Sequence, residues 1–298
     1  MSKVHYTACP VCFSKNIEPV LTAKDYTVSG EAFQIWQCTA CTLRFTQDVP
    51  DEKEIGKYYK SEDYISHSDT RKGAINKLYQ KVRNYTLQQK KKLIVQYTGL
   101  TKGNILDIGA GTGVFLYTMK RAGWEVKGIE PDTDARQIAL RSIQLELMIP
   151  DRLQDLSNGS FDAITLWHVL EHVHPLQQHI EAIKNLLRKN GNLFIAVPNY
   201  QSFDAASYQN YWAAYDVPRH LYHFTPHAME VLLQQHGLKI IEKKPMWFDS
   251  FYISLLSSKY KSGRSSWLGA GWTGLRSNIK AWLHTDLCSS LIYIVKKY

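Results

Sequence analysis

The 298-residue sequence has no apolar run that approaches the ~20 residues needed to span a bilayer, and its first residues lack the apolar core of a signal peptide. From these absences we expect a cytoplasmic protein without a transmembrane segment. Cysteine is also scarce, because the chain has only five and four of them lie within the first 41 residues. This distribution favours metal thiolates in a reducing compartment over a disulfide framework. With 44% hydrophobic residues, the chain can form one large α/β domain and a small appendage.

Acidic residues are missing from parts of the chain. The net charge is +9, and residues 71–92 hold eight basic side chains and no acidic one, while residues 239–298 hold ten basic and three acidic ones. Such clusters suit an anionic partner, for example a phosphorylated sugar, a lipid-linked phosphate, a membrane surface or RNA. A solvated basic helix face explains the same pattern without a partner, so both explanations stay open.

Two C-x-x-C pairs stand near the start of the chain, separated by 25 residues. Each pair can place two thiolates on one tetrahedral Zn²⁺, and four thiolates leave no open position for substrate or water. A redox dithiol is disfavoured, because such a motif normally begins a helix in a βαβ unit that is missing here. We therefore predict a structural zinc ribbon over residues 1–48, with the ligands Cys9, Cys12, Cys38 and Cys41.

Beyond this ribbon the sequence changes from irregular to strongly periodic. Residues 49–99 are predicted as a linker and helical cap, in which Tyr64 and His67 are candidates for a lid or a surface loop. Residues 100–298 alternate strand and helix patterns, including a helix over 175–190, with an insertion at 251–285. This alternation predicts a doubly wound, Rossmann-like α/β sheet with helices on both faces. Seven strands are expected, and the last two, at 238–245 and 290–298, form an antiparallel pair at one edge.

A glycine-rich loop, LDIGAGTG, follows the first strand of this predicted sheet. Its glycines allow a tight turn and a close approach of a ligand to the backbone at the start of a helix. Glu130 ends the second strand, where its carboxylate can accept hydrogen bonds from ribose hydroxyls. A dinucleotide fingerprint requires glycine at position 114, and Val114 therefore disfavours a nicotinamide cofactor.

This loop, Glu130 and the later run FDAITLWHVLEHV together resemble the class I S-adenosylmethionine-dependent methyltransferases, in particular their small-molecule branch. The resemblance covers about residues 75–245. It implies that the loop residues hold the amino-acid part and the sulfur side of S-adenosylmethionine, that Glu130 binds its ribose, and that Asp151 touches the adenine. Trp167 and His168 are expected to face the methyl group. The implied loop residues are Asp107, Gly109, Ala110, Gly111 and Gly113.

Ionisable residues crowd a second segment, YDVPRHLYHFTP at 215–226. The order of ribbon, core and histidine loop is similar to deoxysugar C-methyltransferases, which carry a Glu-His pair where this chain has Arg219 and His220. The resemblance implies that His220 is a candidate base, with His168 and His223 as further candidates. Arg219 in place of glutamate suggests a carboxylate or phosphate on the acceptor. Packing of the loop by His220 and His223 is the open alternative.

The predicted function is S-adenosylmethionine-dependent methyl transfer to a small molecule, a carbohydrate or a related metabolite. One alternative adds a divalent metal at His168, Glu171 and His172, whose spacing resembles the Glu-x-x-Glu-His run of ubiquinone-type and small-RNA O-methyltransferases. Another alternative is a nucleic-acid-binding module that uses the ribbon and the basic helix of residues 71–92. The complete glycine loop favours catalysis over binding alone.

Overall fold

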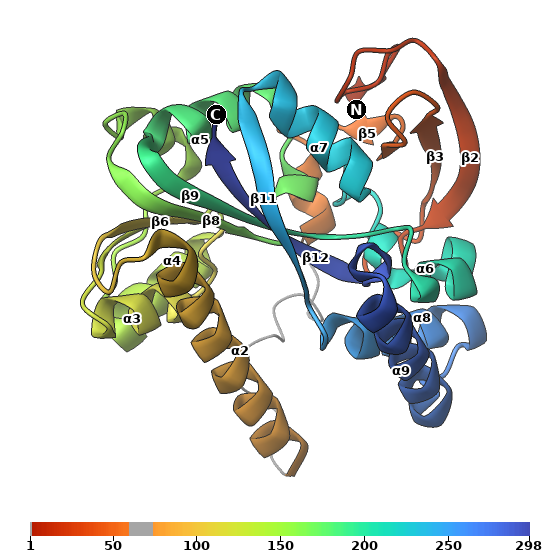
Figure 1. The fold of residues 1–298 in the computed structure, drawn as a ribbon. Coiled ribbons are helices and arrows are strands. Elements are labelled where there is room, and N and C mark those ends of the chain that lie inside the picture. Colours follow the sequence, from red (N-terminus) through yellow and green to blue (C-terminus); the bar gives the residue numbers. More distant parts are fainter. Residues whose placement is uncertain (1, 60–73) are drawn as a thin grey trace.

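The computed structural model describes residues 2–59 and 74–298, with the backbone alone for 74–79, so that Tyr64 and His67 lie outside the described residues. Its main sheet has six strands in these residues, in the order β11-β12-β9-β8-β6-β7 (Figure 1). Four are parallel: β6 (Asn104–Ile108), β7 (Glu125–Ile129), β8 (Phe161–Trp167) and β9 (Leu187–Pro198). The antiparallel strands β11 (Leu238–Pro245) and β12 (Ser290–Lys297) lie at one edge. The predicted doubly wound α/β class is confirmed.

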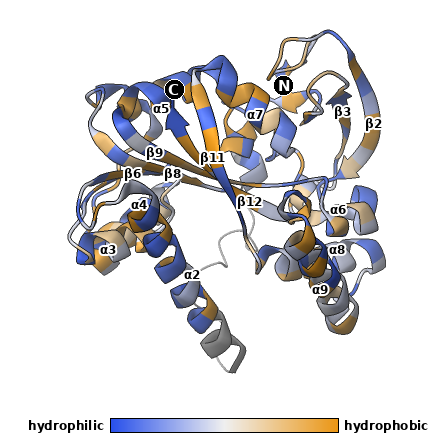
Figure 2. Cartoon of the chain, in the orientation of Figure 1, coloured by the Kyte–Doolittle hydropathy of each residue, from blue (hydrophilic) through white to orange (hydrophobic). Residues whose placement is uncertain are grey.

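Alternating side chains of these strands face two separate hydrophobic layers. In β12, Leu291 and Tyr293 pack with one layer, whereas Ile292 and Ile294 pack with the other. Helices α5 (Leu176–Leu186) and α7 (Pro226–Gln235) cover the first face. The second face is covered by α2 (Ala74–Thr98), α3 (Val114–Arg121) and α4 (Thr133–Ile143) (Figure 1). Figure 2 shows hydrophobic residues along the central strands, where the two layers meet the sheet.

The seventh predicted strand, residues 145–149, is reduced to one parallel bridge between Met148 and Ile129. Pro150 begins the 3-10 helix η2 (Pro150–Asp155) and has no amide hydrogen, so the ladder cannot continue. The predicted helix over 175–190 was too long. Helix α5 ends at Leu186, and Leu187 begins β9, where it pairs with Phe161 of β8 and its side chain is buried.

The insertion forms two helices, α8 (Asp249–Ser262) and α9 (Trp267–Leu283), which pack together beside α6 (Phe203–Tyr208). Short 3-10 helices complete the fold at Ile55–Tyr59, Leu170–His172, Gln209–Tyr211, Ala213–Tyr215 and Thr285–Leu287. Among the helices in the described part of the chain, none has the length and apolar character needed to cross a membrane.

The N-terminal module is continuous with the core through a shared sheet. Strands β2 (Ile17–Lys24), β3 (Ala32–Cys38) and β4 (Arg44–Thr46) form an antiparallel sheet whose edge strand is β10 (Tyr222–His223), from the loop before α7. A second small pair, β1 (Lys3–Val4) and β5 (Val49–Pro50), closes the module. The histidine loop is therefore built on the N-terminal module as much as on the core.

A buried ion network reinforces this junction. The guanidinium of Arg219, 2% exposed, donates to both carboxylate oxygens of Asp216 at 2.6 and 3.0 Å, and to Asp25 Oδ1 at 3.0 Å. It also donates to the Tyr58 carbonyl at 2.8 Å and to the Thr27 hydroxyl. All these partners are internal. The prediction that Arg219 binds an anionic acceptor is therefore corrected: its charge is satisfied by two carboxylates of this chain.

We expect the variant Arg219→Ala to lose about 3–5 kcal/mol of unfolding free energy, because it leaves two carboxylates without their cation in the interior. Arg188→Ala is the matched control, since Arg188 pairs with Asp162 on the surface and is 44% exposed; its loss should be about 1 kcal/mol or less. Chemical denaturation measures both changes. Equal losses for the two variants would contradict a structural role for the Arg219 network.

Candidate active site and metal centre

The glycine loop joins β6 to α3 through three left-handed residues. Gly109, Gly111 and Gly113 have φ of 73°, 54° and 73°. A Cβ on Gly109 would lie 2.3 Å from Val169 Cγ2, whereas a Cβ on Gly111 would meet nothing within 4 Å. Gly109 is thus required by packing, and Gly111 borders open space that a ligand can occupy.

Two carboxylates lie at the edge of the sheet where this loop begins. Asp107 is buried, accepts a hydrogen bond from Thr165 Oγ1 at 2.5 Å, and has its pKa raised to about 7 by burial. Glu130 accepts hydrogen bonds from the amides of Gly111 at 2.7 Å and Asp132 at 2.9 Å, and burial raises its pKa as well. Both predicted cofactor carboxylates therefore lie beside the loop. Burial, which disfavours the charged form of a carboxyl group, is the main cause of both raised pKa values.

The remaining predicted cofactor residues surround the same edge. Asp151 is exposed in η2, three residues beyond the Met148 bridge. Trp167 ends β8, and its ring meets Phe115 edge-on with centroids 5.6 Å apart. The ammonium of Lys90, on α2, lies 4.2 Å from the Trp167 ring centroid.

Sequence reasoning missed Lys90, which belongs to a basic stretch that periodicity assigns to a helix surface. Burial lowers its pKa, and the charges of Asp107 and Asp249 oppose that effect. Only the packing of α2 against β8 turns this one lysine inward. The charge run itself gives no signal that singles it out.

His168 is held between two carboxylates. Its Nε2 lies 3.1 Å from Asp249 Oδ2 on α8, and its Nδ1 lies 3.4 Å from Glu171 Oε1. Burial lowers the pKa of His168, but the contacts with Asp249 and Glu171 outweigh it and raise the pKa to about 10. Both ring nitrogens are committed, so this geometry disfavours the predicted role as a base. Asp249, 81 residues away in sequence, was not predicted.

Glu171, His172 and His220 form a compact cluster whose ligand atoms all lie within 4.8 Å of one another. The two imidazole rings meet edge-on, with centroids 4.6 Å apart. The Nδ1 of His172 lies 3.0 Å from the Arg219 carbonyl, and that of His220 lies 2.8 Å from the Ala214 carbonyl. Because a carbonyl only accepts, each Nδ1 carries a hydrogen, and in the neutral ring Nε2 then keeps its lone pair. The Nδ1 of His172 also lies 3.0 Å from the Tyr59 hydroxyl, and the Nε2 of His220 lies 3.9 Å from Asp216 Oδ2.

Glu171 is fully buried, and its carboxylate has no hydrogen bond to any described residue. A buried carboxylate beside two histidine lone pairs is a donor set that fits a divalent cation. The histidine–carbonyl bonds orient the rings as second-sphere partners do in metal sites. The predicted trio of His168, Glu171 and His172 is therefore modified. His220, rather than His168, completes the cluster with Glu171 and His172, and His168 contacts the Glu171 carboxylate from outside the cluster.

His223 lies elsewhere and faces the N-terminal module. Its Nε2 is 3.2 Å from Thr46 Oγ1, and its ring meets that of Tyr215 edge-on with centroids 5.0 Å apart. Burial lowers its pKa well below the ordinary value, so the ring is neutral. These contacts agree with the packing alternative for His223 rather than with catalysis.

The four N-terminal cysteines converge as the two C-x-x-C pairs require. Cys9 Sγ lies 3.5 Å from Cys41 Sγ, and Cys12 Sγ lies 3.5 Å from Cys38 Sγ. All four sulfur atoms lie within 4.8 Å of one another. Such spacing suits one tetrahedral ion with sulfur ligands at about 2.3 Å.

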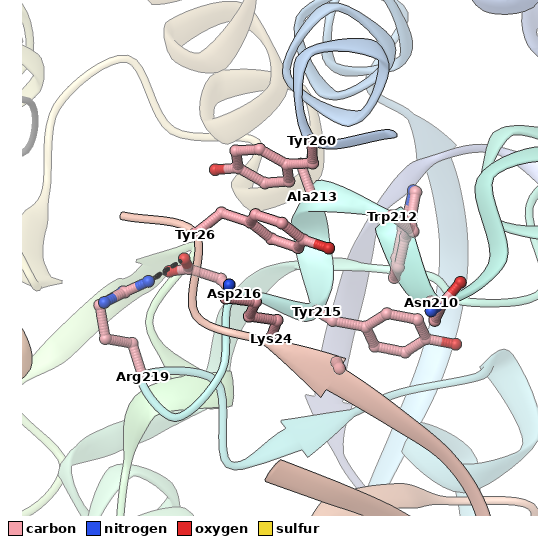
Figure 3. Close-up of a pocket in the computed structure, with 10 residues that line it drawn as sticks. Lys24, Tyr26, Asn210, Trp212, Ala213, Tyr215, Asp216, Arg219 and Tyr260 are labelled. Carbon is pink, nitrogen blue, oxygen red and sulfur yellow. Dashed lines mark hydrogen bonds and ion pairs between the residues drawn. The ribbon is translucent and has the colours of Figure 1, made fainter. Parts of the chain in front are cut away.

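A small cavity lies between the N-terminal module and the insertion. Figure 3 shows Tyr26 and Tyr260 above Asp216 and Arg219, with Trp212 and Asn210 on the other side. The two tyrosine rings are stacked, with centroids 4.5 Å apart. The volume of about 10 Å³ suffices for a single water at most. This cavity is therefore a feature of the Arg219 junction and no acceptor site.

The mostly parallel sheet, the glycine loop and the acidic residues at its carboxyl edge define a Rossmann-like α/β enzyme. Residues 79–243 match the family described as a methyltransferase domain, and the chain belongs to that family. The predicted relationship to the methyltransferases is confirmed.

Two curated relatives illustrate the similarity. The chain is 27% identical over 164 residues to the ubiquinone biosynthesis O-methyltransferase of Cupriavidus pinatubonensis, covering 51% of this chain and 66% of that protein. It is 32% identical over 107 residues to the protein of the same name from Xanthomonas campestris, covering 34% of this chain and 45% of that protein. The chain thus spans less than two thirds of the length of either. A solved S-adenosylmethionine-dependent methyltransferase from Archaeoglobus fulgidus is 18% identical, with a TM-score of 0.48 over 72% of this chain and 94% of the other.

Proposed function

We propose that this protein transfers the methyl group of S-adenosylmethionine to an oxygen of a small-molecule acceptor. One observation carries the proposal: the cluster of Glu171, His172 and His220 adjoins His168, at the same edge of the sheet as the open space beside Gly111. Methyl transfer requires donor and acceptor to meet in line at about 3 Å, so both sites must lie at one edge. The names of the curated relatives support oxygen as the acceptor atom.

The donor would occupy the edge formed by β6, β7 and β8. Gly109, Ala110, Gly111 and Gly113 offer backbone to its amino-acid part, and ionised Asp107 would pair with its ammonium. Lys90, above Trp167, is a cation for its carboxylate. Glu130 is oriented by two amides for the ribose hydroxyls, and Asp151 is the candidate for the adenine. Bound S-adenosylmethionine supplies an already activated methyl group, so these residues need only hold and orient it.

Gly111→Ala is expected to weaken binding of S-adenosylhomocysteine about tenfold, because its methyl group enters space that the ligand needs. Gly159→Ala is the matched control: it has φ of 63°, no neighbour within 4 Å and no place in the site. Both variants share the backbone strain of a left-handed alanine, so only an effect on binding separates them. Calorimetry with S-adenosylhomocysteine measures it, and equal affinities would contradict the donor site.

Labelled methyl transfer from S-adenosylmethionine into fractionated host extract then tests the acceptor class. We expect label in the small-molecule fraction, lowered by Gly111→Ala and kept by Gly159→Ala. A carbohydrate is the acceptor class that the order of ribbon and core favours, and a phenolic quinone precursor is the class that the relatives' names favour. Label in nucleic acid alone would overturn the small-molecule proposal.

Two roles for the acceptor cluster follow from its geometry. In the first, which the buried Glu171 carboxylate without a hydrogen bond favours, Glu171, His172 and His220 hold a divalent cation. Such an ion, when bound, would supply a Lewis acid that lowers the pKa of an acceptor hydroxyl. In the second, His220 removes the acceptor proton through Nε2, while its Nδ1 stays bonded to the Ala214 carbonyl. The Arg219 network supports either role, since the Arg219 carbonyl fixes His172.

Titration with Mn²⁺ separates these roles, because the thiolate cluster is a poor site for this hard ion. We expect one Mn²⁺ site, weakened at least about tenfold in Glu171→Gln. Glu181→Gln is the control, an exposed carboxylate that pairs with Lys184 and His236. If wild-type protein binds no Mn²⁺, or if both variants bind it equally, the cation role fails and the His220 base remains.

We further propose that Cys9, Cys12, Cys38 and Cys41 hold one structural Zn²⁺. The sulfur spacing and the closed set of four ligands support this role. Bound zinc would fix two turns of the module that carries β4, the partner of β10. The metal thereby supports the histidine loop indirectly.

Wild-type protein is expected to contain about one zinc per chain that survives mild chelation. Cys38→Ala should lose the metal and lower the midpoint of thermal unfolding by about 5 °C or more. Cys288→Ala, which truncates a buried cysteine outside the cluster, should keep the zinc. Elemental analysis of the three proteins measures the metal, and full zinc content in Cys38→Ala would contradict the assignment.

A further inference from the structure

An ordinary surface helix buries its large apolar residues. Helix α9 instead buries small residues and exposes large apolar ones. Its buried side consists of small residues: Ala270, Gly274, Ser277 and Ala281. A Cβ on Gly274 would lie 2.7 Å from the Phe251 ring, so this side fits closely against α8. The large apolar residues of α9 therefore remain outside.

The outer side of α9 carries a continuous apolar face. At about 100° per residue, six residues fall within an arc of about 100°. Their side chains are between 44% and 91% exposed. They are Leu268, Trp272, Leu275, Ile279, Trp282 and Leu283. A contiguous exposed face of this kind marks an interaction surface, whereas single exposed apolar residues do not.

Basic residues flank this apolar face. Arg276 and Lys280 follow it on one side of the helix, and the Arg276 guanidinium lies 4.8 Å from the Trp272 ring centroid. Lys259, Lys261 and Arg264, at the end of α8 and in the turn, are also exposed. Residues 250–285 contain these five basic residues and no acidic one. None of the five pairs with a carboxylate of the described residues.

We propose that the exposed face of α9 docks on a membrane surface with anionic headgroups. Trp and Leu on one side of a helix with Lys and Arg beside them is the composition of helices that lie in the membrane interface. Uncompensated positive charge complements anionic lipid, each residue contributing on the order of 1 kcal/mol near the surface. A second copy of this chain is the less suitable occupant, because a two-fold contact through α9 would bring like charges together.

The α8–α9 pair is placed to bring such a surface near the site. In Figure 1 it lies below the sheet, on the side toward which α2 also extends. The first residue of α8, Asp249, contacts His168 at the methyl-transfer edge. Docking therefore positions the enzyme through the same hairpin that contributes to the site. The docking proposal itself stands on the surface of α9 and does not rest on the proposed reaction.

Vesicle flotation of the full chain tests the proposal. Wild-type protein should float with phosphatidylcholine vesicles that contain about 30% phosphatidylglycerol, and far less with phosphatidylcholine alone. Leu268→Ser with Trp272→Ser and Trp282→Ser should reduce binding at least about tenfold. Leu140→Ser, on α4 and 55% exposed, is the apolar control and should float like wild type. All these residues are exposed, so circular dichroism should report unchanged folding.

Charge is tested separately. Arg276→Ser with Lys280→Ser should weaken binding and its salt dependence, whereas Lys120→Ser with Arg121→Ser, on α3, should not. Failure of wild type to float with anionic vesicles, or equal flotation of the triple variant, would overturn the proposal. Sedimentation velocity without vesicles identifies the rival occupant: a wild-type dimer that the triple variant breaks, with no vesicle binding, assigns the face to a second copy.

Discussion

The arrangement of the site depends on one buried cation. Arg219 joins Asp25 of the N-terminal module to Asp216 of the histidine loop, and its own carbonyl accepts the hydrogen of His172 Nδ1. Its neighbour His220 is fixed by the Ala214 carbonyl within the same turn. Removing two carboxylates from water is costly unless a cation meets them with good geometry, and a guanidinium can satisfy both at once. The positions of both cluster histidines are thus coupled to the docking of the module.

This coupling gives the N-terminal module a role in the candidate active site that its four cysteines alone do not suggest. Strand β4 pairs with β10, the Thr46 amide donates to the Leu221 carbonyl, and Thr46 Oγ1 lies 3.2 Å from His223 Nε2. The Thr42 hydroxyl lies 2.8 Å from the hydroxyl of Thr225, at the start of α7. The module therefore packs against one side of the histidine loop. If the four cysteines hold a metal as proposed, that metal would act on the site through the geometry of this module, at a distance from the reacting atoms.

The charged side chains at the carboxyl edge of the sheet also bear on which ligands the site can bind. Asp107, Glu130 and Glu171 are buried carboxylates, whereas Lys90 and the partly exposed His168 are the cations that meet this group of acids. Additional positive charge at this edge would favour the ionised form of Asp107, whose pKa is raised by burial, and would give the oxygens of Glu171 a partner besides His168. A sulfonium donor with an ammonium, and a divalent cation at the cluster, would each supply it.

The sequence by itself determined the class of fold, the thiolate pairs and the donor loop, because each depends on local order. Alternating strand and helix patterns, C-x-x-C spacing and glycines at a strand end need no distant partner to be recognised. The roles of Lys90, Asp249, Arg219 and His220 depend on contacts between segments far apart in the chain. Arg219 meets Asp25 across 194 positions, and no periodicity encodes that meeting. Likewise, the apolar spacing in α9 is visible in the sequence, but which side of the helix is buried was decided only when Gly274 packed against Phe251.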